Sequence, residues 1–97
     1  MSPGKWEVLH AINPTFGMGK NPPLQEYQIV AVIGPETAKS LEDVFMLTNH
    51  IDYDWRKSRW IKTTPEAKRS TSVGDIVIDP KGTVWRCLPC GWEQVKS

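Results

Sequence analysis

Long apolar runs are missing from this chain, and their absence limits where the protein can reside. The longest apolar stretches, such as residues 29–33, are far shorter than the roughly 20 residues that a membrane-spanning helix needs. Residues 1–6 lack the apolar central region of a secretory signal. We therefore expect a cytoplasmic protein without membrane contact.

Cysteine is also scarce, and neither sign of charge is in clear excess. The net charge is +1, so no overall field attracts the molecule to nucleic acid or to a membrane. Two cysteines are too few for a disulfide framework, and a reducing compartment keeps them as thiols. No histidine lies near the hydroxyl-bearing residues 70–75 to activate a nucleophile. The sequence shows no catalytic constellation, and we expect neither an enzyme nor a bound cofactor.

The residues that are present predict a small mixed fold. Residues 6–12 are typical of a first strand, and residues 25–33, with poor alternation and many β-branched side chains, indicate a central strand buried on both faces. Residues 75–78 and 83–87 form a hairpin around the turn 79–82, where Pro80 presets φ and Gly82 accepts a positive φ. A short last strand is expected over residues 91–95.

A helix is predicted over residues 40–49. Ser40 with Asp43 three residues later resembles a capping box. Helical spacing places the expected apolar face on Leu41, Val44, Phe45 and Thr48. Glu42 lies off that face and is expected to be solvated.

These elements predict an α+β domain with a four- to five-stranded, mostly antiparallel sheet, one main helix packed on a face and a C-terminal β-hairpin. A single domain should span residues 1–97, with N-terminal strands in 6–33, the helix at 40–49, a basic loop at 52–72 and the hairpin at 75–95. The helix face is expected to share a core with Ile29, Val30, Val32, Ile76, Ile78 and Trp85.

The C-terminal half also resembles a known family. The matching features are the helix sequence SLEDVF at 40–45, the block RSTSVGDIV at 69–77, and WRC at 85–87 followed by Gly91 and Trp92. Residues 40–95 thus resemble the YodL-like domain of bacteriophage and conjugative-element proteins. The resemblance implies an accessory role during infection or transfer, in the cytoplasm of the host cell, and implies no known chemistry.

The basic loop at residues 52–72, which we call the basic connection, contains the candidate contact segment. Residues 56–69 contain six basic residues and one acidic residue, Glu66, and two tryptophans lie among or beside them. Tryptophan and arginine are enriched in protein interfaces, so a host protein is the expected partner. Cations mixed with indoles also suit phosphate contacts and base stacking, so nucleic acid is the alternative. The candidate partner-binding residues are Trp55, Arg56, Lys57, Arg59, Trp60, Lys62, Lys68 and Arg69.

A further alternative is a zinc-stabilised module. Cys87 and Cys90 have the C-x-x-C spacing of many zinc and redox sites. Two more ligands would have to come from His10 and His50, which are distant in sequence and lack paired spacing. Both cysteines are therefore weak metal candidates, and two packed thiols are the preferred interpretation.

Overall fold

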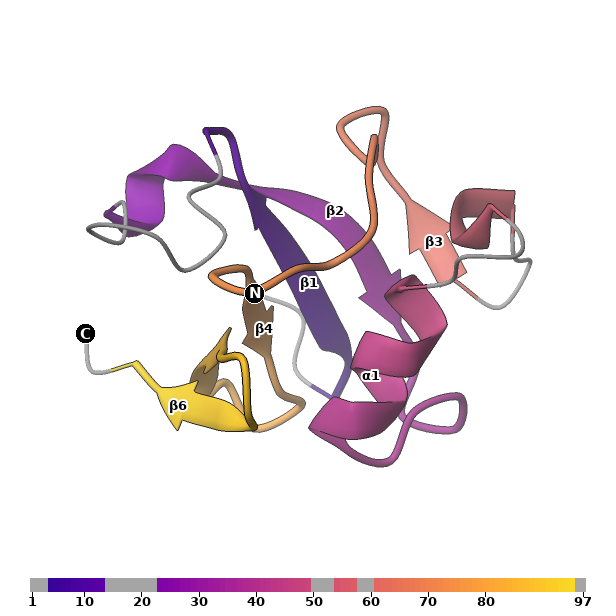
Figure 1. Cartoon of the computed structure of the whole chain (residues 1–97). Helices are drawn as coiled ribbons and strands as arrows, with labels where there is room; N and C mark the ends of the chain where they lie inside the picture. The colour runs from indigo at the N-terminus through magenta and orange to yellow at the C-terminus, as the bar shows by residue number, and fades with distance from the viewer. Residues whose placement is uncertain (1–3, 14–22, 50–53, 58–60, 96–97) are drawn as a thin grey trace.

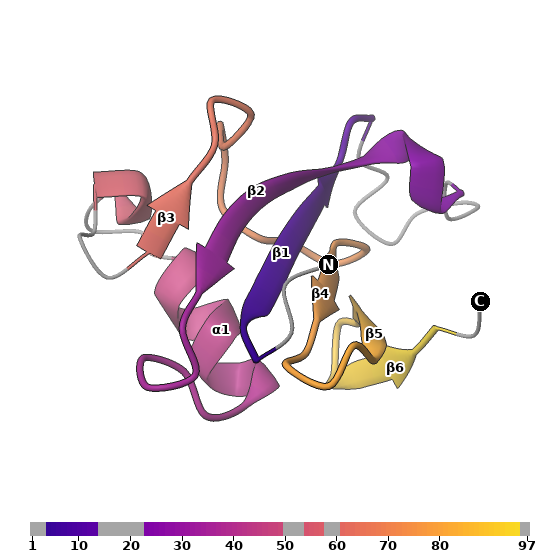
Figure 2. The same cartoon turned by 180° about the vertical axis from the view of Figure 1, so that it is seen from behind.

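One antiparallel sheet organises the protein. The computed structural model describes residues 4–13, 23–49, 54–57 and 61–95. Six strands lie in the order β3-β2-β1-β4-β5-β6 (Figures 1 and 2). Their bounds are β1 Trp6–Ala11, β2 Tyr27–Ile33, β3 Ile61–Thr63, β4 Ile76–Ile78, β5 Val84–Cys87 and β6 Trp92–Gln94. The helix α1, Leu41–Thr48, packs on one face, and 3₁₀ turns η1 and η2 cover Leu24–Glu26 and Trp55–Lys57. The predicted α+β class is confirmed.

A β-bulge explains the poor alternation of β2. Val8 and Leu9 are consecutive in β1, but their partners in β2 are Ala31 and Ile29, so Val30 is an extra residue. The bulge lets Val30 and Ala31 both join the core on the helix side. Ile29 then points to the other face and is 40% exposed. The prediction that β2 is buried on both faces, with Ile29 in the core, is therefore wrong.

The helix begins where the sequence predicts. Ser40 has extended backbone angles, and its side chain accepts a hydrogen bond from the Asp43 N–H at 3.2 Å. Asp43 does not close the capping box, since its carboxylate accepts from the Lys39 N–H at 2.9 Å instead. Val44 and Thr48 are fully buried, whereas Leu41 and Phe45 are half-buried.

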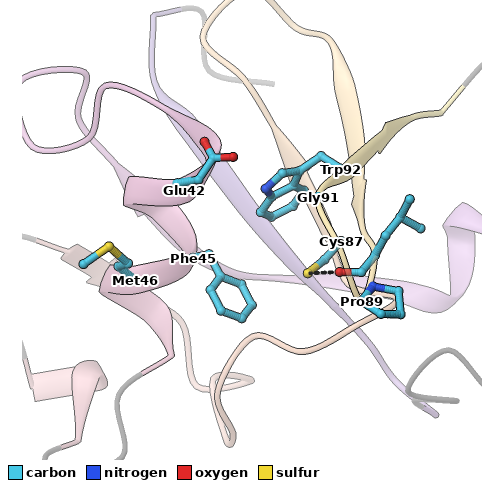
Figure 3. A pocket seen from close by; sticks show the side chains of 8 residues that line it. Glu42, Phe45, Met46, Cys87, Pro89, Gly91 and Trp92 are labelled. Atoms are coloured by element: carbon cyan, nitrogen blue, oxygen red, sulfur yellow. Dashed lines mark hydrogen bonds between the residues drawn. The ribbon is translucent and has the colours of Figure 1, made fainter.

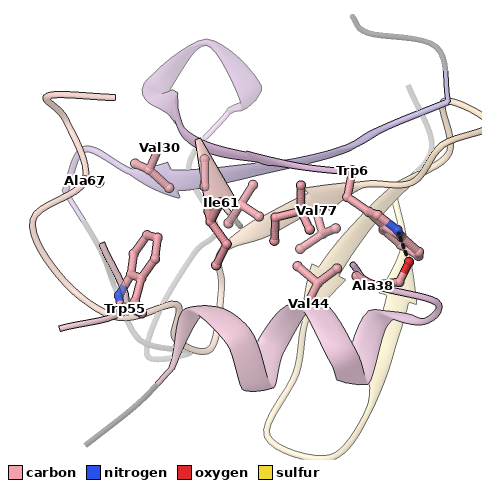
Figure 4. Packing of buried hydrophobic residues seen from close by; sticks show 11 residues of the cluster. Trp6, Val30, Ala38, Val44, Trp55, Ile61, Ala67 and Val77 are labelled. Atoms are coloured by element: carbon pink, nitrogen blue, oxygen red, sulfur yellow. Dashed lines mark hydrogen bonds between the residues drawn. The ribbon is translucent and has the colours of Figure 1, made fainter. Parts of the chain in front are cut away.

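The core lies between α1 and the sheet. Eleven buried residues form it, and Figure 4 shows Val44 of the helix facing Val77 and Ile61 of the strands. Trp6 closes one end, where its indole N–H donates to the Ala38 carbonyl at 2.9 Å. A smaller cluster of Ala11, Tyr27 and Ile76 lies apart from it. In Figure 2 the described part of the chain carries no helix on the face away from α1.

The predicted hairpin forms as expected. The Gly82 N–H donates to the Asp79 carbonyl at 2.9 Å, and Gly82 has a φ of 92°. The Asp79 carboxylate accepts from the N–H groups of Lys81 and Thr83 and from the Trp85 indole. Burial acts to raise the pKa of Asp79, but these hydrogen bonds outweigh it and lower that pKa. Trp85 is accordingly half-buried beside the turn.

The sequence does not reveal β3. It predicted a loop over residues 52–72, whereas residues 61–63 pair with residues 31–33 of β2. Only Ile61 of the three β3 residues is buried, so no alternation marks the strand. The sheet therefore has six strands rather than four or five. No helix in the described ranges is long and apolar enough to cross a membrane.

Candidate interaction site

A buried ion pair fixes the C-terminal end of the basic connection to the start of β4. The Asp75 side chain is 1% exposed, and both of its carboxylate oxygens accept from Arg69, at 2.6 Å and 2.8 Å. The backbone N–H groups of Ser72 and Ala11 complete the set, at 2.7 Å and 3.1 Å. These bonds join residues 69–72 of the basic connection to β1 and to the start of β4. Arg69 therefore has a structural role, and its guanidinium is committed within the molecule.

His10 and Thr71 extend this polar cluster. The His10 ring is 3% exposed, and its Nε2 lies 2.9 Å from Thr71 Oγ1 and 3.9 Å from Asp75 Oδ2. Burial, opposed by the Asp75 charge and assisted by Arg69, lowers the pKa of His10 to about 4. The imidazole is therefore neutral near pH 7. With its hydrogen on Nε2, the ring donates to Thr71 Oγ1, whereas Asp75 Oδ2 at 3.9 Å is too far to accept.

The cluster contains the residue types of a hydrolytic triad but not its geometry. A triad needs the hydroxyl and the carboxylate on opposite ring nitrogens. Here both lie at Nε2, and Nδ1 has no hydrogen-bond partner among the described residues. Thr71 is also fully buried, so substrate cannot reach its hydroxyl. The arrangement stabilises the fold and offers no nucleophile.

The two cysteines occupy different environments. Cys87 is 4% exposed, and Cys90 in the β5–β6 loop is exposed. Burial and the nearby Asp75 charge raise the pKa of Cys87 to about 11, so its thiol stays protonated and unreactive. Within the described ranges no group of three or more potential metal ligands comes together. His50, the other histidine proposed for zinc, lies outside those ranges.

The structure separates the residues of the predicted basic contact segment. Trp55 is 2% exposed and belongs to the core (Figure 4). Its ring meets His10 edge-on, at 6.2 Å between centroids. Its indole therefore does not lie on the surface. Lys57, Lys62 and Lys68 are exposed. Arg59 and Trp60 lie outside the described residues, as does the side chain of Arg56.

A hollow of about 330 Å³ lies between α1 and the β5–β6 hairpin. One wall is formed by Glu42, Phe45 and Met46, and Figure 3 shows Pro89, Gly91 and Trp92 on the opposite wall. The two walls meet where Phe45 packs edge-on against Trp92, at 6.4 Å and 81°. Cys87 and Leu88 complete the lining. We call this hollow the apolar groove.

Local backbone chemistry fixes the hairpin wall of the apolar groove. The Leu88 N–H donates to the Gly91 carbonyl at 3.0 Å, which closes the β5–β6 loop. Gly91 has a φ of 92°, a value that side-chain-bearing residues rarely adopt, and Pro89 restricts the loop further. These local features define the conformation of the hairpin wall.

The sequence does not reveal the apolar groove. It placed Phe45 in the core, whereas Phe45 is half-buried and lines the groove. A signal was present in Met46, a large apolar residue that lies off the predicted core face and is 65% exposed. The approach of the β5–β6 hairpin to α1 is a long-range contact that no local pattern indicates.

Comparisons of the chain with protein-family models, with curated proteins and with solved structures found no match. The fold and the site geometry therefore carry the functional argument. The similarity of residues 40–95 to the YodL-like domain stays a prediction.

Proposed function

We propose that this chain is a non-enzymatic, protein-binding accessory protein whose contact surface includes the apolar groove. In keeping with the resemblance of its C-terminal half, we assign it to a bacteriophage or mobile element. Its target is then a host protein of the nucleic-acid machinery or of a defence system, bound in the host cytoplasm and inhibited or redirected there.

The groove is the observation that carries this proposal. Its walls combine a half-buried tryptophan, a phenylalanine, a proline and an exposed methionine. Aromatic residues and methionine are enriched in protein interfaces, and methionine adapts its shape to different partners. The thiol at its floor is protonated, so the groove offers contact area without a reactive group.

The experiment is affinity capture from bacterial lysate with wild-type protein and two variants. Met46→Arg places a charge in the groove at a side chain that is already 65% exposed. Ile12→Arg makes the same change at another exposed apolar residue, 52% exposed and outside the groove lining. A stoichiometric partner should be captured by wild type and Ile12→Arg and lost with Met46→Arg. Capture of no such partner, or equal capture by all three proteins, contradicts the proposal.

A second candidate function is direct nucleic-acid binding by the basic connection. Lys57, Lys62 and Lys68 are exposed and make no ion pair with the described residues, which favours this alternative. Affinity should then fall linearly with the logarithm of salt concentration, and replacing all three lysines by glutamine should reduce the slope by about 3. Absence of DNA and RNA binding at low salt excludes this function.

A further inference from the structure

We propose that the apolar groove binds a peptide segment of a partner protein in which an apolar side chain lies next to a lysine or arginine, and that Glu42 pairs with this cation. The inference rests on the proposed protein-binding function and adds the chemistry of the partner. It assigns the apolar side chain to the Phe45–Trp92 contact and the cation to the rim of the groove.

The apolar half of the recognition follows from the lining. A volume of about 330 Å³ is at the lower end of the range for concave binding sites. Trp92 and Phe45 present ring surface at the floor, and the exposed thioether of Met46 can close over an inserted side chain. Burial of one large apolar side chain is the interaction that this shape offers.

The charged half follows from Glu42. It is exposed, and it is the one charged residue among the described residues that line the groove. Neither an ion pair nor a hydrogen bond joins its carboxylate to the described part of the chain. The carboxylate is thus available to a cation from outside.

The adjoining hollow contributes a second carboxylate. A second hollow of about 250 Å³ lies on the other side of Met46, with Thr37, Asp43 and Leu47 around it. Helix α1 itself contains two acidic residues and no basic one. A phosphate backbone would therefore be repelled here, whereas a basic peptide crossing Met46 would meet a carboxylate on either side.

Selection from a random peptide display library tests this proposal without a known partner. The library is selected against wild type, Glu42→Lys, and Glu66→Lys as a matched control at an exposed glutamate outside the groove lining. Wild type and Glu66→Lys should enrich peptides with an apolar residue within two positions of a lysine or arginine. Those peptides, synthesised singly, should bind Glu42→Lys about tenfold more weakly, with the loss shrinking at high salt. Thermal unfolding should show that all three proteins are folded.

Three outcomes overturn the inference. These are the enrichment of no peptide by wild type, the enrichment of peptides without basic residues, and equal binding to wild type and Glu42→Lys. Capture from lysate distinguishes the failure of this inference from the failure of the proposed function. A partner lost with Met46→Arg but retained with Glu42→Lys leaves protein binding intact and removes the basic–apolar specificity.

Discussion

Replacing Arg69 by methionine would leave a charged carboxylate inside the protein. Asp75 is 1% exposed and would lose two of its four hydrogen bonds, keeping those from Ser72 and Ala11. Removing one partner of a buried pair costs about 3–5 kcal/mol. The Arg69 side chain is 26% exposed, so the pair is partly solvated and we expect about 3 kcal/mol. In a domain of this size that loss lowers Tm by more than about 10 °C.

The assay is urea unfolding of wild type and Arg69→Met at pH 7. Arg86→Met is the control, because the Glu93 side chain of that pair is 54% exposed and the loss should stay within about 1 kcal/mol. A cost below about 1 kcal/mol for Arg69→Met refutes the reasoning.

Two further predictions concern the buried titratable groups. The folded pKa of His10 is about 4 against 6.5 unfolded, so the unfolded chain binds more protons in that window and His10 removes about 2 kcal/mol of stability between pH 7 and pH 5. In urea unfolding of His10→Gln, the free energy of unfolding should depend on pH less strongly, by that amount. An unchanged pH dependence would contradict the lowered pKa of His10. Iodoacetamide at pH 7.5 should label Cys90 alone in the native protein and both cysteines in urea. Mass spectrometry counts the labels, and rapid native labelling of Cys87 would show that its thiol is accessible.

Local chemistry made several elements predictable. The Ser40 cap, the Asp79–Gly82 turn and the helix that follows Ser40 each depend on residues within a few positions of one another. Such patterns are visible in a sequence because the interactions that they describe are short in range. The strand β3 escaped because only one of its residues is buried and its partner lies about thirty residues earlier.

The candidate site was less predictable for a related reason. The cations and indoles of the basic connection form a clear pattern, but composition does not say which side chains face inward. Trp55 packs into the core and Arg69 pairs with a carboxylate six positions later. The apolar groove arises where α1 meets a hairpin about forty residues away, so neither segment alone reveals it. In the sequence, only Met46 indicated a second apolar surface on the helix, because it is apolar and lies off the predicted core face.

The hydrogen bonds of Thr71 have a mechanical consequence for the apolar groove. The Thr71 N–H donates to the Thr48 carbonyl at 2.9 Å, and its own carbonyl accepts from the Asn49 side chain at 2.6 Å, so the C-terminal end of α1 is tethered to the Arg69–Asp75 segment. An eight-residue helix is unstable by itself. Its position, and with it one wall of the groove, therefore depends on this tether. Occupancy of the groove should consequently slow hydrogen exchange at the Thr71 amide, and loss of the ion pair should weaken binding at a surface that it does not touch.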